Sequence, residues 1–222
     1  MDNINQYIDH TLLKATATQK DIIHLCKEAK THNFYAVCVN GSYVALAKEE
    51  LKGSNVKVAA VVGFPLGAMC AKSKIFEARQ AVVDGAEEID MVINIGNLLD
   101  GEYEKVEEEI RQVKLAIGHY TLKVIFENCY LTQEQIKKVS QLAINAGADF
   151  IKTSTGFGTN GATVEDVTVM KEIAKNKIEI KAAGGIRDIA TAQTYIKIGV
   201  TRLGTSSGVA LVTEGNIKDG SY

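Results

Sequence analysis

Two stretches of the sequence, ADFIKTST at 148–155 and IEIKAAGG at 178–185, each place a lysine inside an otherwise apolar β-strand pattern. Successive side chains of a strand point to opposite faces, so Lys152 faces away from Ile151, and Lys181 likewise faces away from its apolar neighbours. These are successive strand patterns along the chain, and adjacent strands lie about 5 Å apart. The two ammonium groups are therefore expected to be neighbours on one face of a sheet.

Short apolar runs of this kind alternate with longer amphipathic stretches along the whole chain. The runs are rich in Val and Ile and mostly apolar on both faces, which is typical of parallel strands covered by helices. There are eight of them, at Tyr7–Leu12, Tyr35–Val39, Val56–Gly63, Glu88–Ile93, Leu122–Glu127, Asp149–Thr153, Ile178–Ala182 and Thr201–Thr205. This order predicts a parallel sheet with right-handed crossovers.

Two architectures fit eight such units, a closed (β/α)8 barrel and an open doubly wound sheet. An open sheet keeps its strands apolar and its chemistry in loops at one switch point. A barrel instead collects polar residues from many strands on its axis. Polar residues interrupt several of the runs, which favours a single-domain (β/α)8 TIM barrel over residues 1–222; they are Asp9, His10, Asp90, Glu127, Lys152 and Lys181.

The amphipathic stretches carry start and stop signals of helices. Thr18, Thr132 and Thr163 each stand three residues before an Asp or Gln, the spacing of an N-cap pair. The glycines of DGA at 84–86 and AGA at 146–148 are predicted to end helices in the left-handed conformation.

Composition excludes several classes of protein. The net charge is −2 and no basic cluster is present, so a nucleic-acid partner is not expected. The first residues, MDNINQYIDH, lack the pattern of a signal peptide, and the apolar runs are too short for membrane spans. Four scattered cysteines, Cys26, Cys38, Cys70 and Cys129, show no metal or redox spacing, which suits a cytoplasmic protein without a bound metal.

The paired lysines indicate a specific chemistry. Burial and repulsion between like charges both lower the pKa of a lysine, and a neutral amine is the nucleophile of Schiff-base catalysis. Asp90, in EIDMV, alternates to the same inner face as Lys152 and could relay protons. The alternative for each lysine alone is a structural ion pair with a carboxylate.

Glycine-rich turns follow the last strands, where barrels of this class usually bind phosphate. Backbone amides at such turns can bind an anion. A phosphorylated small substrate is therefore predicted, with tight turns alone as the alternative; the candidate contacts are Gly156, Gly184, Gly185, Arg187, Gly204, Ser206 and Ser207.

The chain resembles the deoxyribose-phosphate aldolase family through YIDHTLLKATAT, AVCVN, VVGFPLGA, EIDMVINIG, DFIKTSTGFGTNGATVEDV, IKAAGGIRD and RLGTSSGV, in order and over nearly its whole length. The resemblance implies a reversible, metal-free cleavage of 2-deoxy-D-ribose 5-phosphate to D-glyceraldehyde 3-phosphate and acetaldehyde, without a cofactor. It assigns the Schiff base to Lys152 and proton transfer to Asp90 and Lys181. It also places the phosphate contacts on Gly184, Gly185, Ser206 and Ser207.

Two positions add to this resemblance. Phe157 stands where some longer members carry a phosphate-binding lysine, which would shift phosphate binding toward backbone amides. Tyr222 ends a tail, 216–222, that is expected to be mobile, and in the family a terminal tyrosine can assist proton transfer. A homo-oligomer, dimer or tetramer, is expected for an enzyme of this kind.

Two other functions remain open from the residues alone. A sugar-phosphate isomerase would use the same barrel and phosphate loops without needing paired lysines. A phosphosugar-binding sensor would bind ligand without turnover.

Overall fold

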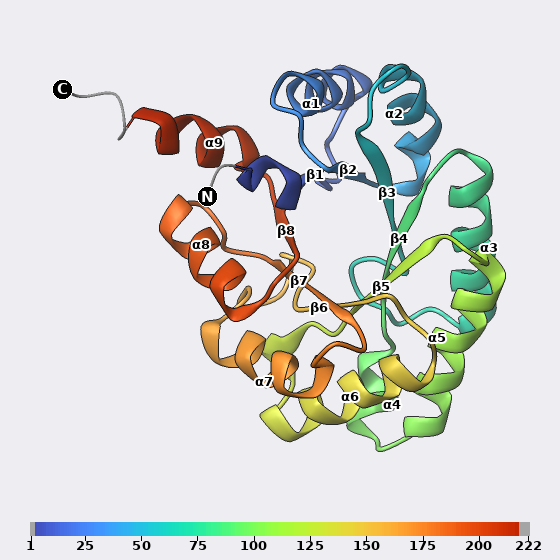
Figure 1. The fold of residues 1–222 in the computed structure, drawn as a ribbon. Helices are drawn as coiled ribbons and strands as arrows, with labels where there is room; N and C mark the ends of the chain where they lie inside the picture. Colours follow the sequence, from blue (N-terminus) through green and yellow to red (C-terminus); the bar gives the residue numbers. More distant parts are fainter. Residues whose placement is uncertain (1–2, 218–222) are drawn as a thin grey trace.

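Eight parallel strands close into a barrel in the computed structural model, which describes residues 3–217 (Figure 1). The strands follow one another around the barrel in sequence order, and β8 pairs with β1 to complete it. Their bounds are β1 Ile8–Leu12, β2 Ala36–Val39, β3 Lys57–Val62, β4 Glu88–Val92, β5 Thr121–Ile125, β6 Phe150–Lys152, β7 Glu179–Ala183 and β8 Arg202–Thr205.

Helices cover the outside of the barrel (Figure 1). The α-helices are α1 Gln19–Thr31, α2 Val44–Glu50, α3 Ala71–Val83, α4 Ile95–Leu99, α5 Tyr103–Ile117, α6 Gln133–Asn145, α7 Val164–Ala174, α8 Ile189–Ile198 and α9 Gly208–Ile217. Three short 3-10 helices, η1 Ile4–Tyr7, η2 Gly41–Tyr43 and η3 Asn128–Tyr130, lie between them. The main hydrophobic core lies between the outer face of the strands and these helices, and includes Ile89, Met91 and Ile151.

The prediction of a barrel rather than an open sheet is confirmed, and each of the eight apolar runs overlaps one strand; β5 begins one residue before its run, and β7 ends one residue after its own. The helix signals are confirmed as well. Thr18 and Thr132 form reciprocal capping boxes, and the Thr163 hydroxyl accepts a hydrogen bond from the Asp166 amide. Gly85 and Gly147 follow the ends of α3 and α6 with φ of 110° and 80°. These local signals therefore mark where the helices of the crossovers begin and end.

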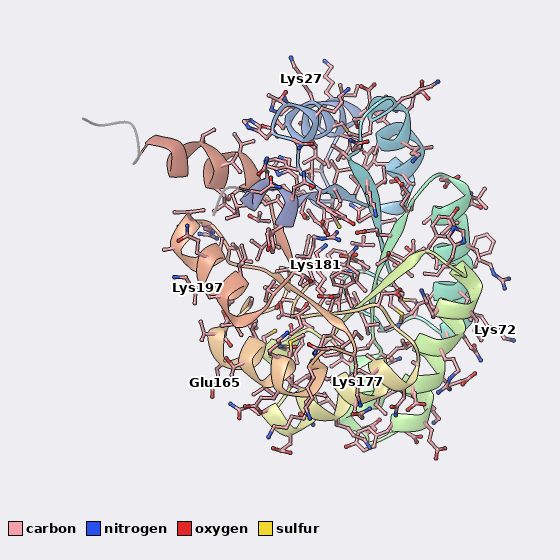
Figure 2. All side chains as sticks on the ribbon, in the orientation of Figure 1. Lys27, Lys72, Glu165, Lys177, Lys181 and Lys197 are labelled. Carbon is pink, nitrogen blue, oxygen red and sulfur yellow. The ribbon has the colours of Figure 1, made fainter. Side chains whose placement is uncertain are left out.

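Alternation along the strands puts the charged residues on the barrel axis. Ile151 packs in the outer core, whereas Lys152 and Asp90 meet inside the barrel. Figure 2 shows the same contrast for labelled lysines: Lys181 lies among the strands, while Lys27 and Lys72 project from the surface. The closed sheet thus converts a strand pattern into a central charged site.

Candidate active site

Lys152 and Lys181 are cross-strand partners at the centre of the barrel. Lys152 is 2% exposed and Lys181 is fully buried. Both Nζ atoms contact the same oxygen of Asp90, Oδ2, at 2.7 Å for Lys152 and 2.8 Å for Lys181. The structure therefore brings together the three residues that the sequence singled out for covalent chemistry and proton transfer.

Four further charged side chains extend this group. Lys123 on β5 contacts the other oxygen of Asp90 at 2.7 Å and Glu88 at 2.6 Å. Asp9 on β1 is hydrogen-bonded to Lys181. Arg202 on β8 contacts Asp9 at 3.0 Å and Glu88 at 2.9 Å.

Three members of this group, Glu88, Lys123 and Arg202, were not among the residues predicted from the sequence, although Lys123 and Glu88 carried a signal. Lys123 stands between Leu122 and Val124 in an apolar run, as Lys152 does in its own. Glu88 lies two residues before Asp90 and so shares its face. The criterion that found the paired lysines, a charge flanked by apolar residues in a strand pattern, would have found Lys123, whereas Glu88 follows Glu87 and Arg202 follows Thr201.

The environment lowers the pKa of Lys152. Burial is the largest cause, because it disfavours the charged form. Asp90 opposes this effect by raising the pKa, and Lys181 lowers it further by charge repulsion. The neighbouring lysine therefore contributes to a neutral amine, as the sequence suggested, but desolvation contributes more.

Lys181 and Asp90 are shifted toward their charged forms. Burial alone would lower the pKa of Lys181, but the charges of Asp9 and Asp90 outweigh it and raise that pKa. Burial would raise the pKa of Asp90, but Lys123, Lys152 and Lys181 hold it well below its usual range. Among the paired lysines, Lys152 is thus the one whose environment favours the neutral amine.

Two polar residues from the strand runs lie outside this group of contacts. His10 points away from the axis and bonds to Glu28 of α1 through Nε2, at 2.8 Å. Glu127 adopts a left-handed backbone conformation, with φ of 58°, and its buried carboxylate accepts hydrogen bonds from the Thr155 amide and hydroxyl. Glu127 therefore ties the loop that follows β6 to the end of β5.

A cavity of about 300 Å³ opens beside Lys152 at the carboxyl ends of β1, β6, β7 and β8. All seven predicted anion contacts line it: Gly156, Gly184, Gly185, Arg187, Gly204, Ser206 and Ser207. Phe157 also lines the cavity, and its ring meets that of Phe64 edge to face. Lys14, which follows β1, adds a cationic side chain that the sequence analysis had not assigned.

The start of α8 leaves fewer amides for an anion than an uncapped helix would. Asp188 caps it by accepting hydrogen bonds from the Thr191 amide and hydroxyl. The cap uses an amide that an anion would otherwise bind. At this end of β7, the cavity wall is instead formed by Gly184 and Gly185, whose φ values are 85° and 78°.

The remaining features of the sequence are the cysteines, the end of the chain and possible metal or membrane patterns. Cys38 lies on the inner face of β2, and burial raises the pKa of its thiol. Tyr222 and the last part of the 216–222 tail lie outside the described residues. Within residues 3–217, no group of His, Cys, Asp and Glu side chains is placed to hold a metal ion, and no helix is long and apolar enough to cross a membrane.

A (β/α)8 barrel that holds a desolvated lysine beside a glycine-lined cavity is typical of barrel enzymes that use a lysine in their chemistry. Residues 4–211 match the model of the DeoC/LacD family aldolases. The chain belongs to this family, and its class is that of the aldolases, which are lyases.

Similar proteins carry the same description. A deoxyribose-phosphate aldolase from Deinococcus radiodurans is 54% identical over 96% of this chain and 97% of its own length. A solved structure described as "QR15, an Aldolase" is 42% identical with a TM-score of 0.94, and the match covers 99% of this chain and 98% of that one. The deoxyribose phosphate aldolase of Aeropyrum pernix, described as having a unique tetrameric structure, is 30% identical with a TM-score of 0.87 and coverage of 96% and 91%.

Proposed function

We propose that this aldolase reversibly cleaves 2-deoxy-D-ribose 5-phosphate to D-glyceraldehyde 3-phosphate and acetaldehyde through a Schiff base on Lys152. The observation that carries the proposal is a buried lysine with a lowered pKa whose side chain lines the glycine-walled cavity. A neutral amine in that position can attack a bound carbonyl without first losing a proton to solvent. Relatives named deoxyribose-phosphate aldolase support the choice of substrate.

The reaction would begin with attack of Lys152 Nζ on the aldehyde carbon, C1, of the open-chain sugar. The carbinolamine then loses water to give an iminium, which draws electrons as the C2–C3 bond breaks. The C3 hydroxyl gives up its proton, and D-glyceraldehyde 3-phosphate leaves. The remaining two-carbon enamine takes a proton at C2, and water releases acetaldehyde and restores the amine.

Proton transfer in these steps is assigned to Asp90 and Lys181. Asp90 is hydrogen-bonded to Lys152 and to Lys181, which gives protons a path of direct hydrogen bonds between the two amines. Tyr222 is proposed as a further proton-transfer group, and Tyr222→Phe is expected to lower kcat.

The phosphate group is expected at the mouth of the cavity, between the loops after β6, β7 and β8. Gly184, Gly185 and Ser207 would offer backbone amides and a hydroxyl to its oxygens. Lys14 and Arg187 line the same cavity and bring positive charge to it. These groups favour an anion in the same cavity that Lys152 lines, as a phosphorylated aldehyde would need.

A trapping experiment tests the assignment. Acetaldehyde and borohydride should add a reduced two-carbon unit to Lys152 and abolish cleavage of deoxyribose 5-phosphate, with a chelator present throughout. Lys152→Ala should be inactive and unlabelled at this position, whereas Lys72→Ala, which changes an exposed lysine, should behave as the parent enzyme. Cleavage activity that survives borohydride treatment would instead favour a sugar-phosphate isomerase type of site, and binding without turnover would favour a sensor.

Assembly and location are part of the same proposal. A homo-oligomer, dimer or tetramer, is supported by the tetramer described for the Aeropyrum pernix relative. The cytoplasm is supported by four free cysteines, since reducing compartments keep thiols unpaired.

A further inference from the structure

The charged residues of the barrel axis form a closed ring in which positive and negative groups alternate. Each member contacts the two neighbours of opposite charge beside it, and Lys123 also lies 3.9 Å from Asp9 across the ring. The order around the ring is Glu88, Lys123, Asp90, Lys181, Asp9, Arg202 and back to Glu88. Apart from the close Lys181–Asp9 contact, the distances between charged atoms of neighbouring members run from 2.6 to 3.0 Å.

Lys152 stands outside this ring and is attached to it at one point. Its contact with Asp90 is to an oxygen that Lys181 already uses. The ring contains three carboxylates and three cations, so its formal charge is zero before Lys152 is counted. A protonated Lys152 would make the buried group positive, and uncompensated buried charge is costly.

We propose that Glu88 and Arg202, which do not line the cavity, are positioning residues that close the ring and keep it neutral, so that Lys152 is the lysine of this axial group left without a carboxylate of its own. The proposal rests on the assignment of Lys152 as the reactive amine. Neither residue lines the cavity beside Lys152. Both would act on the reaction only through the charges between them and that lysine.

The surroundings of Glu88 and Arg202 support a purely electrostatic role. The Arg202 guanidinium lies 3.5 Å from the centre of the Tyr35 ring and 5.3 Å from that of Phe150. Lys57, at the start of β3, donates to the Tyr35 hydroxyl at 3.0 Å. Arg202 is thus held against aromatic rings at the start of β8, and it does not line the cavity.

Lys152 itself is faced by a small set of charged or titratable groups. Asp90 and Lys181 contact it or its carboxylate directly, and Cys38 of β2 is the other titratable neighbour, with a thiol whose pKa burial has raised. Lys123 and Asp9 lie one contact further along the ring. With the thiol neutral, the charge that Lys152 experiences is set by the ring.

Changing the ring charge by one in each direction gives a signed test. Glu88→Gln leaves the ring at +1, which disfavours a further cation, so the pKa of Lys152 should fall. Arg202→Gln leaves the ring at −1, so that pKa should rise. A unit charge at this range in a protein interior shifts a pKa by on the order of one unit.

Two further variants separate charge from structural damage. Glu88→Asp changes the shape of the side chain but keeps the ring neutral, so it is the matched control for Glu88→Gln. The double variant Glu88→Gln with Arg202→Gln removes one charge of each sign and restores neutrality. Both should return the pKa of Lys152 toward that of the parent enzyme, even if thermal unfolding shows that the double variant is less stable.

The measurement is the rate at which acetaldehyde and cyanoborohydride modify Lys152, followed by peptide mass across a pH series for each variant. We expect the pH midpoint of the modification rate to fall in Glu88→Gln, to rise in Arg202→Gln, and to return toward the parent value in the double variant. Midpoints that stay fixed, or that move in the same direction in both single variants, would overturn it. If the modification falls on another lysine in the parent enzyme, the proposed function fails before the ring is tested.

Discussion

Lys152 and Lys181 share a single carboxylate oxygen, Oδ2 of Asp90, from adjacent strands of the barrel. The sharing is unequal because Lys181 has a second carboxylate partner, Asp9, whereas Asp90 is the single carboxylate among the described residues that Lys152 contacts. The two lysines are chemically the same residue in matching positions of neighbouring strands. Their different partners explain why only Lys152 is expected to supply a neutral amine.

Removing the charge of Lys181 should therefore change the pH dependence of the enzyme. Repulsion from Lys181 lowers the pKa of Lys152, so Lys181→Met should raise that pKa. The acid limb of kcat/KM reports protonation of the amine and should move to higher pH. The loss of a proton-transfer group should also lower kcat by about 10²- to 10⁴-fold. Lys197→Met, on the outer surface of α8, is the control and should leave the profile unchanged.

Asp9 should contribute stability that disappears in acid. Burial would raise its pKa, but Lys181, Arg202 and Lys123 outweigh this and lower it from 3.8 to about 2. A lowered carboxylate pKa stabilises the folded state above the unfolded value and loses that contribution as pH falls toward the folded value, here between about pH 4 and 2. The shift corresponds to roughly 2 kcal/mol of the free energy of unfolding.

Urea unfolding at several pH values checks this contribution. Asp9→Asn should be less stable than the parent protein at pH 7, because Lys181 and Arg202 lose a buried partner, and should lose less further stability between pH 4 and 2. Asp100→Asn, at an exposed position, should follow the parent curve. Parallel curves for Asp9→Asn and the parent protein would contradict the role of Asp9.

Glu127 should control substrate binding through the loop after β6. Its carboxylate accepts from the Thr155 amide at 3.0 Å and also from the Thr155 hydroxyl. Glu127→Gln replaces two charged acceptor oxygens with a single neutral one. The hydrogen bonds that hold the loop should weaken by about 1.5–3 kcal/mol. KM for deoxyribose 5-phosphate should rise about tenfold or more.

Labelling of Lys152 by acetaldehyde is the second measurement for this variant. It should change little, because acetaldehyde has no phosphate for the loop to bind. Glu165→Gln, on the outer surface at the start of α7, is the matched control (Figure 2). A large loss of labelling in Glu127→Gln would place Glu127 in the chemistry instead.

Periodicity predicted the barrel because the information is local and repeated. Each strand run carries its own apolar pattern, and signals such as Thr18 and Gly147 mark where crossovers turn. Polar interruptions such as Lys152 then distinguished a closed sheet from an open one. None of these inferences needed knowledge of which distant residues meet.

The pairing of charges could not be predicted in the same way. Asp9 and Arg202 are neighbours only because β8 closes on β1, and they stand 193 positions apart in the chain. Glu127 faces the axis in the strand pattern, yet its left-handed backbone turns the carboxylate to the following loop. His10, one residue along from Asp9, points to α1 because strand alternation places it on the outer face.

The contact between the loops after β6 and β7 offers a final prediction. Gly161 has no room for a side chain, since an added Cβ would lie 2.2 Å from the carbonyl oxygen of Gly184. The Ala162 amide also bonds to the carbonyls of Ala183 and Gly184, at 3.1 Å each. Gly161→Ala should force apart two loops that line the cavity and cost about 1–3 kcal/mol of stability by overpacking. KM for the phosphorylated substrate should rise while Lys152 still reacts with acetaldehyde, because the ion pairs of the axis are untouched.

The control is Gly41→Ala, because an added Cβ there meets no atom within 4 Å; it should alter the free energy of unfolding by less than about 0.5 kcal/mol. If Gly161→Ala lost stability but kept the KM of the parent enzyme, the contact between the two loops would not shape the anion site.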